Sequence, residues 1–197
     1  MTDILLIRHS TTKYVNNKLA GRVDAPLNEE GRKKAHELAV ALSGQPIRAV
    51  YASPLLRTMQ TADSLADRLH LVTEPDKNLI QVDYGDWEEK SFWELEQDPS
   101  WRKFVSRPEG QIPGGEHVQE VVERVSRSLS RIAECHPGDE MVAVVTHGSI
   151  IRFAIAHILG MEQGCANRLK IYPGSVSVLR LGGPINVLVS MNRLFFS

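Results

Sequence analysis

Cysteine is almost absent from this chain, because only Cys135 and Cys165 occur among its 197 residues and they show no C-x-x-C spacing. We therefore expect neither a disulfide framework nor a thiolate metal site, and a reducing cytoplasm is the expected location. Long apolar runs are also missing. The first run, Ile4 to Ile7, is far shorter than a signal peptide or a membrane span requires, so no membrane association is expected.

An excess of either charge is missing as well. The chain has 23 Lys and Arg against 24 Asp and Glu, which gives a net charge of -1. A protein that coats nucleic acid is normally far more basic, so we expect no nucleic-acid partner, and any anion binding has to be local. The 42% of hydrophobic residues is enough for a buried core. The length predicts one domain, residues 1–197.

Short apolar runs alternate with helical patterns along the chain. Strands are predicted over residues 4–7, 47–52, 141–145, 175–181 and 185–189. Apolar side chains at helical spacing predict helices between them, the first with Asn28 as its N-cap and the second opened by Ser53-Pro54. Further helices are predicted around residues 118–132 and 151–159. This alternation indicates an α/β fold with a mostly parallel central sheet.

Residues 79–115 do not follow this alternation, and they predict an insertion that stands over the sheet. The insertion contains Trp87, Trp93, Trp101 and Phe104. We expect these aromatic side chains to pack the insertion itself, with stacking on a base or sugar of a ligand as the alternative.

Three of the predicted strands lead into polar residues. The first is followed by Arg8 and His9, the second by a helix that carries Arg57 in its first turn, and the third by His147. Because the carboxyl ends of parallel strands form the ligand-binding edge of an open α/β sheet, these side chains should converge. Two arginines, two histidines and the N-termini of helices suit a phosphoryl group.

Each of these residues also has a structural interpretation. Arg57 alone would be a solvated helix residue, and His147 a core histidine or a helix cap. The other histidines are all expected to be structural; they are His36, His70, His117, His136 and His157. No H-E-x-x-H or H-x-H spacing occurs, so we expect no metal site and no cofactor.

The order of the motifs is more specific than any one of them. Leu-Ile-Arg8-His9 is followed by Ser53-Pro-Leu-Leu-Arg57, then by Tyr-Gly-Asp-Trp-Glu and by Val-Thr-His147-Gly. This order resembles the histidine phosphatase superfamily, also called phosphoglycerate mutase-like, over nearly the whole chain. The resemblance implies a three-layer α/β/α sandwich with a helical cap insertion, and hydrolysis of a small phosphorylated metabolite.

The resemblance also implies roles for single residues. His9 would be the nucleophile that becomes phosphorylated, while Arg8, Arg57 and His147 would bind the phosphoryl group. The positions that would contact substrate are Ser10, Asn16, Gly21, Gln81 and Gly148. A nucleophilic imidazole has to be neutral, and two neighbouring guanidinium groups disfavour its protonated form.

One position departs from the family pattern in a way that affects the chemistry. Where the family has a proton-donating glutamate, this chain has Gln81, whose amide cannot donate a proton as a carboxylic acid does. Asp83 would point to the same side of an extended segment and is a candidate catalytic replacement. We predict a phosphatase, with mutase-like phosphoryl transfer, or a phosphate-binding regulatory module with weak turnover, as alternatives. A homodimer is left open.

Overall fold

The computed structural model of the protein describes residues 1–195 and has a six-stranded sheet at its centre. The strand order is β3-β2-β4-β1-β5-β6. The strands are β1 (Thr2–Arg8), β2 (Ile47–Ala52), β3 (Thr73–Pro75), β4 (Met141–Thr146), β5 (Val176–Leu181) and β6 (Val187–Arg193). The first four in this list are parallel to one another, whereas β5 and β6 form an antiparallel edge. The expected mostly parallel sheet is confirmed.

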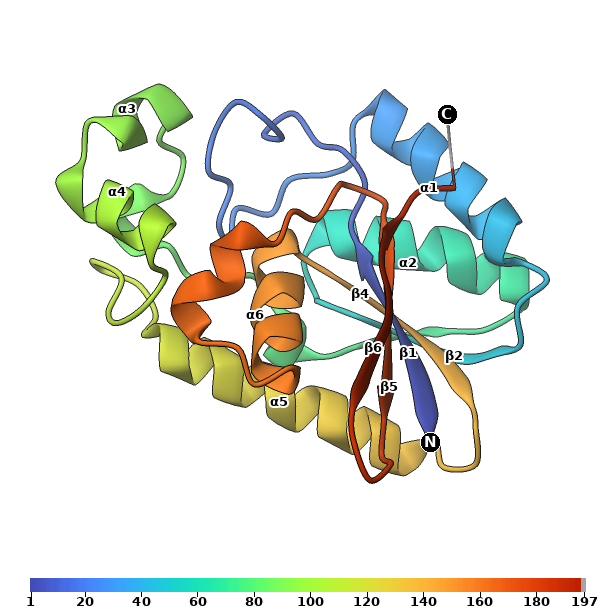
Figure 1. The fold of residues 1–197 in the computed structure, drawn as a ribbon. Coiled ribbons are helices and arrows are strands. Elements are labelled where there is room, and N and C mark those ends of the chain that lie inside the picture. Colours follow the sequence, from blue (N-terminus) through green and yellow to red (C-terminus); the bar gives the residue numbers. More distant parts are fainter. Residues whose placement is uncertain (196–197) are drawn as a thin grey trace.

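Helices cover both faces of the sheet, as Figure 1 shows. One layer consists of α1 (Glu29–Leu42) and α2 (Leu56–Leu69), and the other of α5 (Val118–Cys135) and α6 (Gly148–Ile158). Successive side chains of β1 point alternately towards the two helical layers. Ile4 and Leu6 pack with α5 and α6, while Leu5 and Ile7 pack with α1 and α2. Each such fully buried side chain contributes about 1.5–3 kcal/mol. The three-layer α/β/α sandwich is therefore confirmed.

The start of α1 agrees with the prediction from the sequence, whereas the start of α2 does not. Asn28 is the N-cap of α1, and its side chain accepts a hydrogen bond from the backbone N–H of Gly31 at 2.7 Å. The second helix begins only at Leu56, after Pro54, so the expectation that Ser53-Pro54 opens it is wrong. Asp24, from a distant loop, accepts the Leu56 N–H instead at 2.6 Å. A tertiary contact thus sets this helix start.

The last strand also differs from its prediction. It runs from Val187 to Arg193, whereas the pattern predicted residues 185–189. Its outward-facing side chains Val187, Val189 and Met191 are exposed on the edge strand, so the apolar pattern there does not mark burial.

The predicted insertion contains short helices rather than strands. They are η2 (Gly85–Trp87), α3 (Phe92–Glu96) and α4 (Pro99–Ser106), and η1 (Lys77–Leu79) leads into them. Figure 1 shows α3 and α4, in green, at the end of the molecule away from α1. We call residues 79–115 the cap. That the cap is an insertion within a single domain remains a prediction.

Aromatic packing holds the cap together. The ring of Trp87, which is 2% exposed, lies 5.2 Å from that of Trp101 and 5.3 Å from that of Phe104. Trp93 is 73% exposed and takes no part in this cluster. Among residues 1–195, no helix combines the length and the apolar character that crossing a membrane requires.

Candidate active site

The ends of three neighbouring strands bring the predicted polar residues together. In the sheet register, Arg8 of β1 pairs with Thr146 of β4, and Ala52 of β2 pairs with Val145. The residues that follow the ends of β1, β2 and β4 therefore lie next to one another. Backbone hydrogen bonds extend the pairing by one step, from His9 N–H to the Thr146 carbonyl at 2.9 Å. The predicted convergence at the carboxyl ends of the strands is present.

His9 is buried, and its geometry determines which nitrogen is free. Its Nδ1 lies 2.7 Å from the backbone oxygen of Ser10. A carbonyl oxygen can only accept, so Nδ1 carries the hydrogen and donates it. The other nitrogen, Nε2, then keeps its lone pair. Burial, followed by the charges of Arg57 and Arg8, holds the pKa of His9 well below its usual value of 6.5. His9 is thus a neutral imidazole with one nitrogen available for attack.

His147 lies beside His9, with 5.3 Å between the ring centroids. Its Nε2 is 2.7 Å from the hydroxyl oxygen of Ser53, and its Nδ1 is buried without a hydrogen-bond partner among residues 1–195. Burial lowers the pKa of His147 well below 6.5, and the nearby Arg57, His9 and Arg8 lower it further. The side chain is oriented by Ser53, and its residue is the N-cap of α6 without a capping hydrogen bond from the ring. Its interpretation as a core histidine with all its hydrogen bonds satisfied is therefore wrong.

Two guanidinium groups flank the histidines, and backbone carbonyls fix both of them. Arg8 donates to the carbonyl of Ile171 at 2.5 Å, and its buried Nε has no partner within the described part of the chain. Arg57 donates to the carbonyls of Val23 and Gly21 at 2.6 and 2.7 Å. With 1% of its surface exposed, Arg57 is not the solvated helix residue that its position alone suggested. Burial lowers the pKa of each arginine to about 10, so both remain charged at neutral pH.

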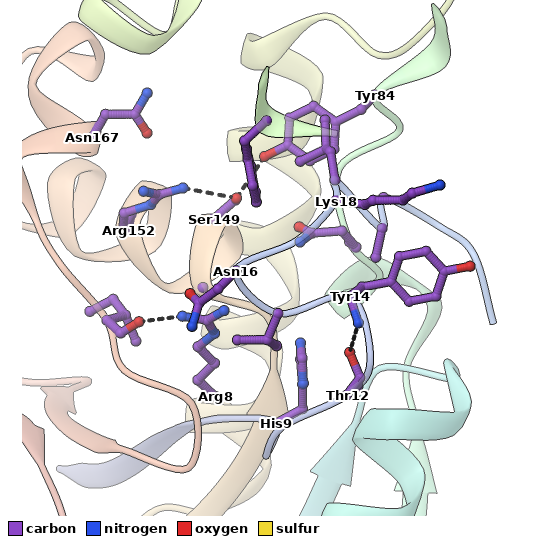
Figure 2. A pocket seen from close by; sticks show the side chains of 18 of the residues that line it. Arg8, His9, Thr12, Tyr14, Asn16, Lys18, Tyr84, Ser149, Arg152 and Asn167 are labelled. Carbon is purple, nitrogen blue, oxygen red and sulfur yellow. Dashed lines mark hydrogen bonds between the residues drawn. The ribbon is translucent and has the colours of Figure 1, made fainter. Parts of the chain in front are cut away.

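Arg8, His9 and Arg57 open into one pocket of about 380 Å³, whereas His147 is fully buried and does not line it. Figure 2 shows Arg8 and His9 at its floor, with Asn16 and Tyr14 from the loop that follows β1. The predicted substrate-contacting residues that line it are Asn16, Gly21, Gln81 and Gly148. Ser10 does not line it: this residue is buried behind His9, where its backbone N–H donates to the hydroxyl of Thr61 at 3.2 Å. None of the histidines expected to be structural is among the lining residues.

A side chain would not fit at Gly21, and at Gly148 it would crowd Arg8. Gly21 has a φ of +50°, and a Cβ there would lie 2.0 Å from Oε1 of Glu88. A Cβ at Gly148 would lie 3.2 Å from the Nε of Arg8. Both glycines therefore let the backbone approach the groups that surround the pocket.

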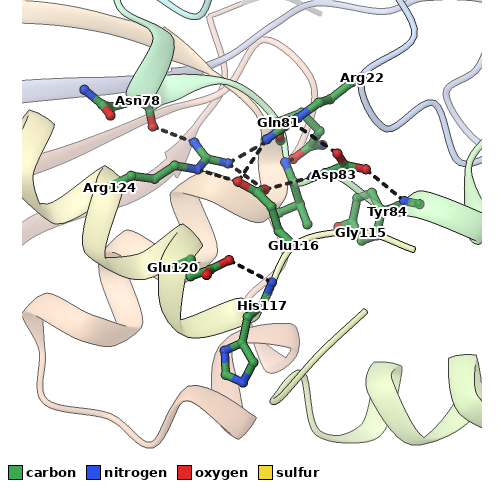
Figure 3. Close-up of polar contacts among 12 residues, drawn as sticks. Arg22, Asn78, Gln81, Asp83, Tyr84, Gly115, Glu116, His117, Glu120 and Arg124 are labelled. Atoms are coloured by element: carbon green, nitrogen blue, oxygen red, sulfur yellow. Dashed lines mark hydrogen bonds and ion pairs between the residues drawn. The ribbon is translucent and has the colours of Figure 1, made fainter. Parts of the chain in front are cut away.

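Gln81 lines the pocket, and its backbone is firmly held. The guanidinium groups of Arg22 and Arg124 both donate to the Gln81 carbonyl, at 3.1 and 3.3 Å, and Figure 3 shows this arrangement. Arg22 and Arg124 also bind the carboxylate of Glu116, at 2.9 and 3.0 Å. The amide oxygen of Gln81 accepts the N–H of Val82 at 2.9 Å. The backbone of Gln81 is thus held by two guanidinium groups, and its amide oxygen is engaged by the next residue of the chain.

The structure does not bring Asp83 to the pocket. One carboxylate oxygen of Asp83 accepts the backbone N–H of Gly85 at 3.0 Å, and the other forms an ion pair with Arg22 at 3.3 Å. The chain turns into η2 directly after this residue, so Asp83 caps the turn instead of pointing to the same side as Gln81. Glu88 is also engaged elsewhere, because it accepts the N–H of Arg22 at 2.8 Å. Among residues 1–195, no Asp or Glu lines the pocket.

Several lining residues were not found from the sequence. They are Thr12, Lys18, Tyr84, Ser149, Arg152, Asn167 and Lys170, with the aromatic Phe92 of the cap. Trp101 and Phe104, for which both packing and ligand contact were considered, also line it. Trp101 and Phe104 therefore both pack the cap and face the pocket. A signal existed for Arg152, since it lies one helical turn after Gly148 and shares its face of α6. Asn167 and Lys170 come from η3 (Gln163–Arg168) and the irregular segment after it, for which no pattern exists.

No group of three or more His, Cys, Asp or Glu residues within residues 1–195 is arranged to hold a metal ion. The cations of the pocket are side chains, namely the guanidinium groups of Arg8, Arg57 and Arg152 and the ammonium groups of Lys18 and Lys170. Together with His9, they can bind an oxyanion and present an imidazole nitrogen to it.

Comparisons with known proteins agree with this chemistry. The model of the histidine phosphatase superfamily (branch 1) matches residues 4–194. A probable phosphoglycerate mutase from Cronobacter sakazakii is 30% identical over 181 residues, which cover 90% of this chain and 84% of the relative. Phosphoserine phosphatase 1 from Hydrogenobacter thermophilus is 29% identical over 202 residues, with coverage of 98% and 92%.

A solved structure gives the same result for the fold. A mutant phosphoserine phosphatase from Entamoeba histolytica, in complex with phosphoserine, matches with a TM-score of 0.88 and 25% identity, covering 98% of this chain and 97% of that one. The same enzyme in complex with 3-phosphoglyceric acid matches with a TM-score of 0.87 and 25% identity, with 98% of both chains covered.

Proposed function

The chain belongs to the histidine phosphatase superfamily, and we propose that it hydrolyses small phosphate monoesters through a phosphohistidine formed on His9. The observation that carries the assignment of His9 is its neutral imidazole, whose Nδ1 hydrogen is engaged by Ser10 while Nε2 remains available. The guanidinium groups of Arg8 and Arg57 lie on either side of it as ligands for phosphoryl oxygens.

The first step forms the Nε2–phosphorus bond and breaks the bond between phosphorus and the ester oxygen. Negative charge moves to the departing oxygen, while Arg8, Arg57 and His147 hold the phosphoryl oxygens. Because backbone carbonyls and Ser53 already fix these groups, little reorganisation is needed in the transition state. In the second step a water oxygen attacks phosphorus, the Nε2–phosphorus bond breaks, and inorganic phosphate leaves.

The departing oxygen needs a proton when it leaves as an alkoxide, and the water needs a base. Gln81 faces the pocket but supplies neither function, and Asp83 is held by Arg22 and Gly85. An acidic phenol leaves without such help, whereas an alkyl alcohol does not. We therefore expect aryl phosphates to phosphorylate His9 rapidly, in a burst, and alkyl phosphates to do so slowly, while the hydrolysis of the phosphoenzyme is slow for both.

The same observation supports a second candidate function. With Gln81 in place of an acid, the protein would bind phosphorylated ligands, turn them over weakly and act as a regulatory module. Mutase-like transfer is the third alternative, and the name of the Cronobacter relative supports it. A mutase returns the phosphoryl group to substrate, so product isomers rather than inorganic phosphate would appear.

The substrate we propose is a small phosphorylated metabolite. Relatives bind phosphoserine and 3-phosphoglyceric acid, and the pocket volume of about 380 Å³ suits molecules of that size. A homodimer and a cytoplasmic location remain predictions.

The test is the detection of the phosphoenzyme. Labelled substrate should transfer an acid-labile, alkali-stable phosphoryl group to the wild type and not to His9→Ala, and turnover should fall about 10⁴-fold or more. His157→Ala, which changes an exposed histidine of α6, is the matched control. Label retained in His9→Ala would refute the assignment. EDTA should leave the activity of the wild type intact, because arginines supply the cationic groups in this mechanism.

A further inference from the structure

Strand β6 is irregular at Asn192. Arg193 of β6 pairs with Val176 of β5. Ser190 pairs with Val178, so two residues of β6 face a single residue of β5 between the two pairs. Asn192 also has a φ of +63°, in the left-handed region that few residues other than glycine, asparagine and aspartate adopt. These features are those of a β-bulge, and bulges often lie beside active sites, where they redirect a side chain.

The bulge gives Asn192 two hydrogen bonds outside the regular strand pairing. Its backbone N–H donates to the side-chain hydroxyl of Ser177 at 3.1 Å. Its side-chain oxygen accepts the backbone N–H of Tyr172 at 2.8 Å. Tyr172 belongs to the irregular segment between η3 and β5. Asn192 thus attaches the edge strand of the sheet to a segment without regular secondary structure.

Asn192 and Arg8 bind opposite sides of one peptide unit. The N–H of Tyr172 and the carbonyl of Ile171 belong to the same planar, trans peptide group. Asn192 accepts from the N–H, and the carbonyl accepts from Arg8 at 2.5 Å, which is the bond drawn at Arg8 in Figure 2. Within residues 1–195, this is the one hydrogen bond of the Arg8 side chain. A rotation of the peptide plane would therefore release the guanidinium group, and Asn192 opposes that rotation.

Other bonds from the same segment hold the backbone of Arg8 and not its side chain. The N–H of Gly174 donates to the Arg8 carbonyl at 2.9 Å, and the Arg8 N–H donates to the Ser175 carbonyl at 3.1 Å. These bonds fix the main chain, but they do not determine where the guanidinium group points. That direction depends on the Ile171 carbonyl. In the described part of the chain, Asn192 is the one side chain besides Arg8 that forms a hydrogen bond with this peptide unit.

We propose that Asn192 is a positioning residue of the active site, which holds the guanidinium group of Arg8 in place through the peptide between Ile171 and Tyr172. An acceptor at the N–H also strengthens the carbonyl of the same peptide as an acceptor, because aligned hydrogen bonds polarise one another. This inference rests on the proposed function, in which Arg8 binds phosphoryl oxygens. It gives β6 a part in the reaction, although none of residues 187–193 lines the pocket.

Asn192→Gly tests the side chain, because glycine adopts the left-handed conformation without strain and lacks the acceptor. It should lower kcat/KM for p-nitrophenyl phosphate, which reports the steps up to phosphorylation of His9, about 3- to 10-fold, the effect of one lost hydrogen bond. Asn192→Asp keeps an oxygen acceptor and tolerates the same φ, so it should stay within about twofold of the wild type. Asn186→Gly, at an exposed position just before the same strand, is the matched control and should leave kcat/KM unchanged.

A double-mutant cycle with Arg8 separates positioning from a general effect on the fold. If Asn192 acts through Arg8, Asn192→Gly should have little further effect on kcat/KM in the Arg8→Met background. The same factor in both backgrounds would mean that Asn192 acts independently of Arg8, and it would overturn the inference. An unchanged kcat/KM in Asn192→Gly overturns it as well, and so does an equal loss in Asn192→Asp and Asn192→Gly.

If Asn192→Gly does not fold, the wild type still tests the contact. Tyr172 is 43% exposed, so its amide hydrogen is protected from solvent mainly by the bond to Asn192. Hydrogen exchange at this amide should be about 10-fold slower than at an unprotected one, or slower still. Exchange at the unprotected rate would overturn the inference.

Failure of the proposed function would look different. In that case the wild type would not hydrolyse p-nitrophenyl phosphate. The same cycle would then be measured as the affinity for inorganic phosphate by titration calorimetry, with the same factors expected and the same outcomes overturning the role of Asn192.

Discussion

The two ends of the pocket are built in different ways. At the strand ends, backbone carbonyls fix the charged side chains: Ile171 holds Arg8, Ser10 orients His9, and Gly21 and Val23 hold Arg57. At the cap, aromatic packing and a few side-chain contacts with irregular backbone hold the lining. The strand end is therefore pre-organised for one reaction, whereas the cap can change between substrates without disturbing it.

Gln81 lies where these two ends meet. Arg22 and Arg124 donate hydrogen bonds to its backbone carbonyl, but its side chain is an amide and has no carboxyl group that could act as an acid in the reaction. We therefore expect a substitution at the strand end to change the hydrolysis rates of all substrates by a similar factor. The effect of a substitution at Gln81 should depend on the leaving group, and the effect of one at the cap should depend on the shape of the substrate.

The largest effect on chemistry is expected from Gln81→Glu. A carboxyl group at this position could protonate a departing alkoxide and later activate water, so alkyl phosphates should be hydrolysed about 10²–10⁴-fold faster. For aryl phosphates the burst should change much less, whereas the slow hydrolysis of the phosphoenzyme that follows it should become faster. Rapid-quench kinetics with one alkyl and one aryl ester measures both steps, and the wild type should show a burst followed by slow release.

Asp83→Asn is the matched control for that experiment. Because Arg22 and Gly85 hold this carboxylate outside the pocket, the change should leave alkyl phosphate rates within a few-fold of the wild type. A loss of about 10²-fold or more would show that Asp83 reaches the substrate during turnover and would restore it as the acid.

A smaller and uniform effect is expected from Arg57→Met. Losing the hydrogen bonds of one guanidinium to a phosphoryl group should lower kcat/KM about 10- to 100-fold, by a similar factor for chemically different monoesters. Arg180→Met, which removes a surface ion pair with Asp3, should have no such effect. If one substrate loses activity and another does not, Arg57 belongs to the specificity end of the pocket.

Acid should destabilise the folded protein through the two buried histidines of the strand end. His9 and His147 have pKa values held well below 6.5, so in this range the unfolded chain binds more protons than the folded one. Stability is therefore fully present above pH 6.5 and is lost as the pH falls below it, by up to about 1.4 kcal/mol per pH unit for each histidine.

Thermal unfolding measured between pH 7 and pH 5 checks this direction. The slope should be smaller in His9→Asn, which removes one of the two groups. An equal slope in His9→Asn and the wild type would mean that other groups cause the acid sensitivity.

The smallest effect is expected at the contact between η3 and the cap. Asn167 donates to the carbonyls of Phe104 and Val105 at 3.3 and 3.0 Å, and each bond is worth about 0.5–1.5 kcal/mol. Asn167→Ala should loosen α4 and raise KM a few-fold, with a smaller change in kcat. Hydrogen exchange of the α4 amides should rise at the same time. A fall in kcat without a change in KM would contradict this separation of the two ends.

Much of the fold was predictable, because local patterns determine local elements. The apolar runs became buried strands, and the helical spacing of Ala35, Leu38 and Leu42 became the buried face of α1. The errors fall where distant contacts decide. Asp24 moves the start of α2 to Leu56, and the exposed apolar residues of β6 do not mark burial.

The chain order by itself placed His9, Arg57 and His147 in one site, since parallel strands must end at a common edge and their next residues must meet there. The motif order also led to the prediction that Gln81 occupies the position of the family's acid, and this stays a prediction. Only the tertiary structure decided that Asp83 turns away to Arg22, and that Arg152, Asn167 and Lys170 join the pocket. The physical reason is that strand register carries residues to an edge by a repeating geometry. Irregular segments, in contrast, are positioned by individual hydrogen bonds and ion pairs that no periodic pattern encodes.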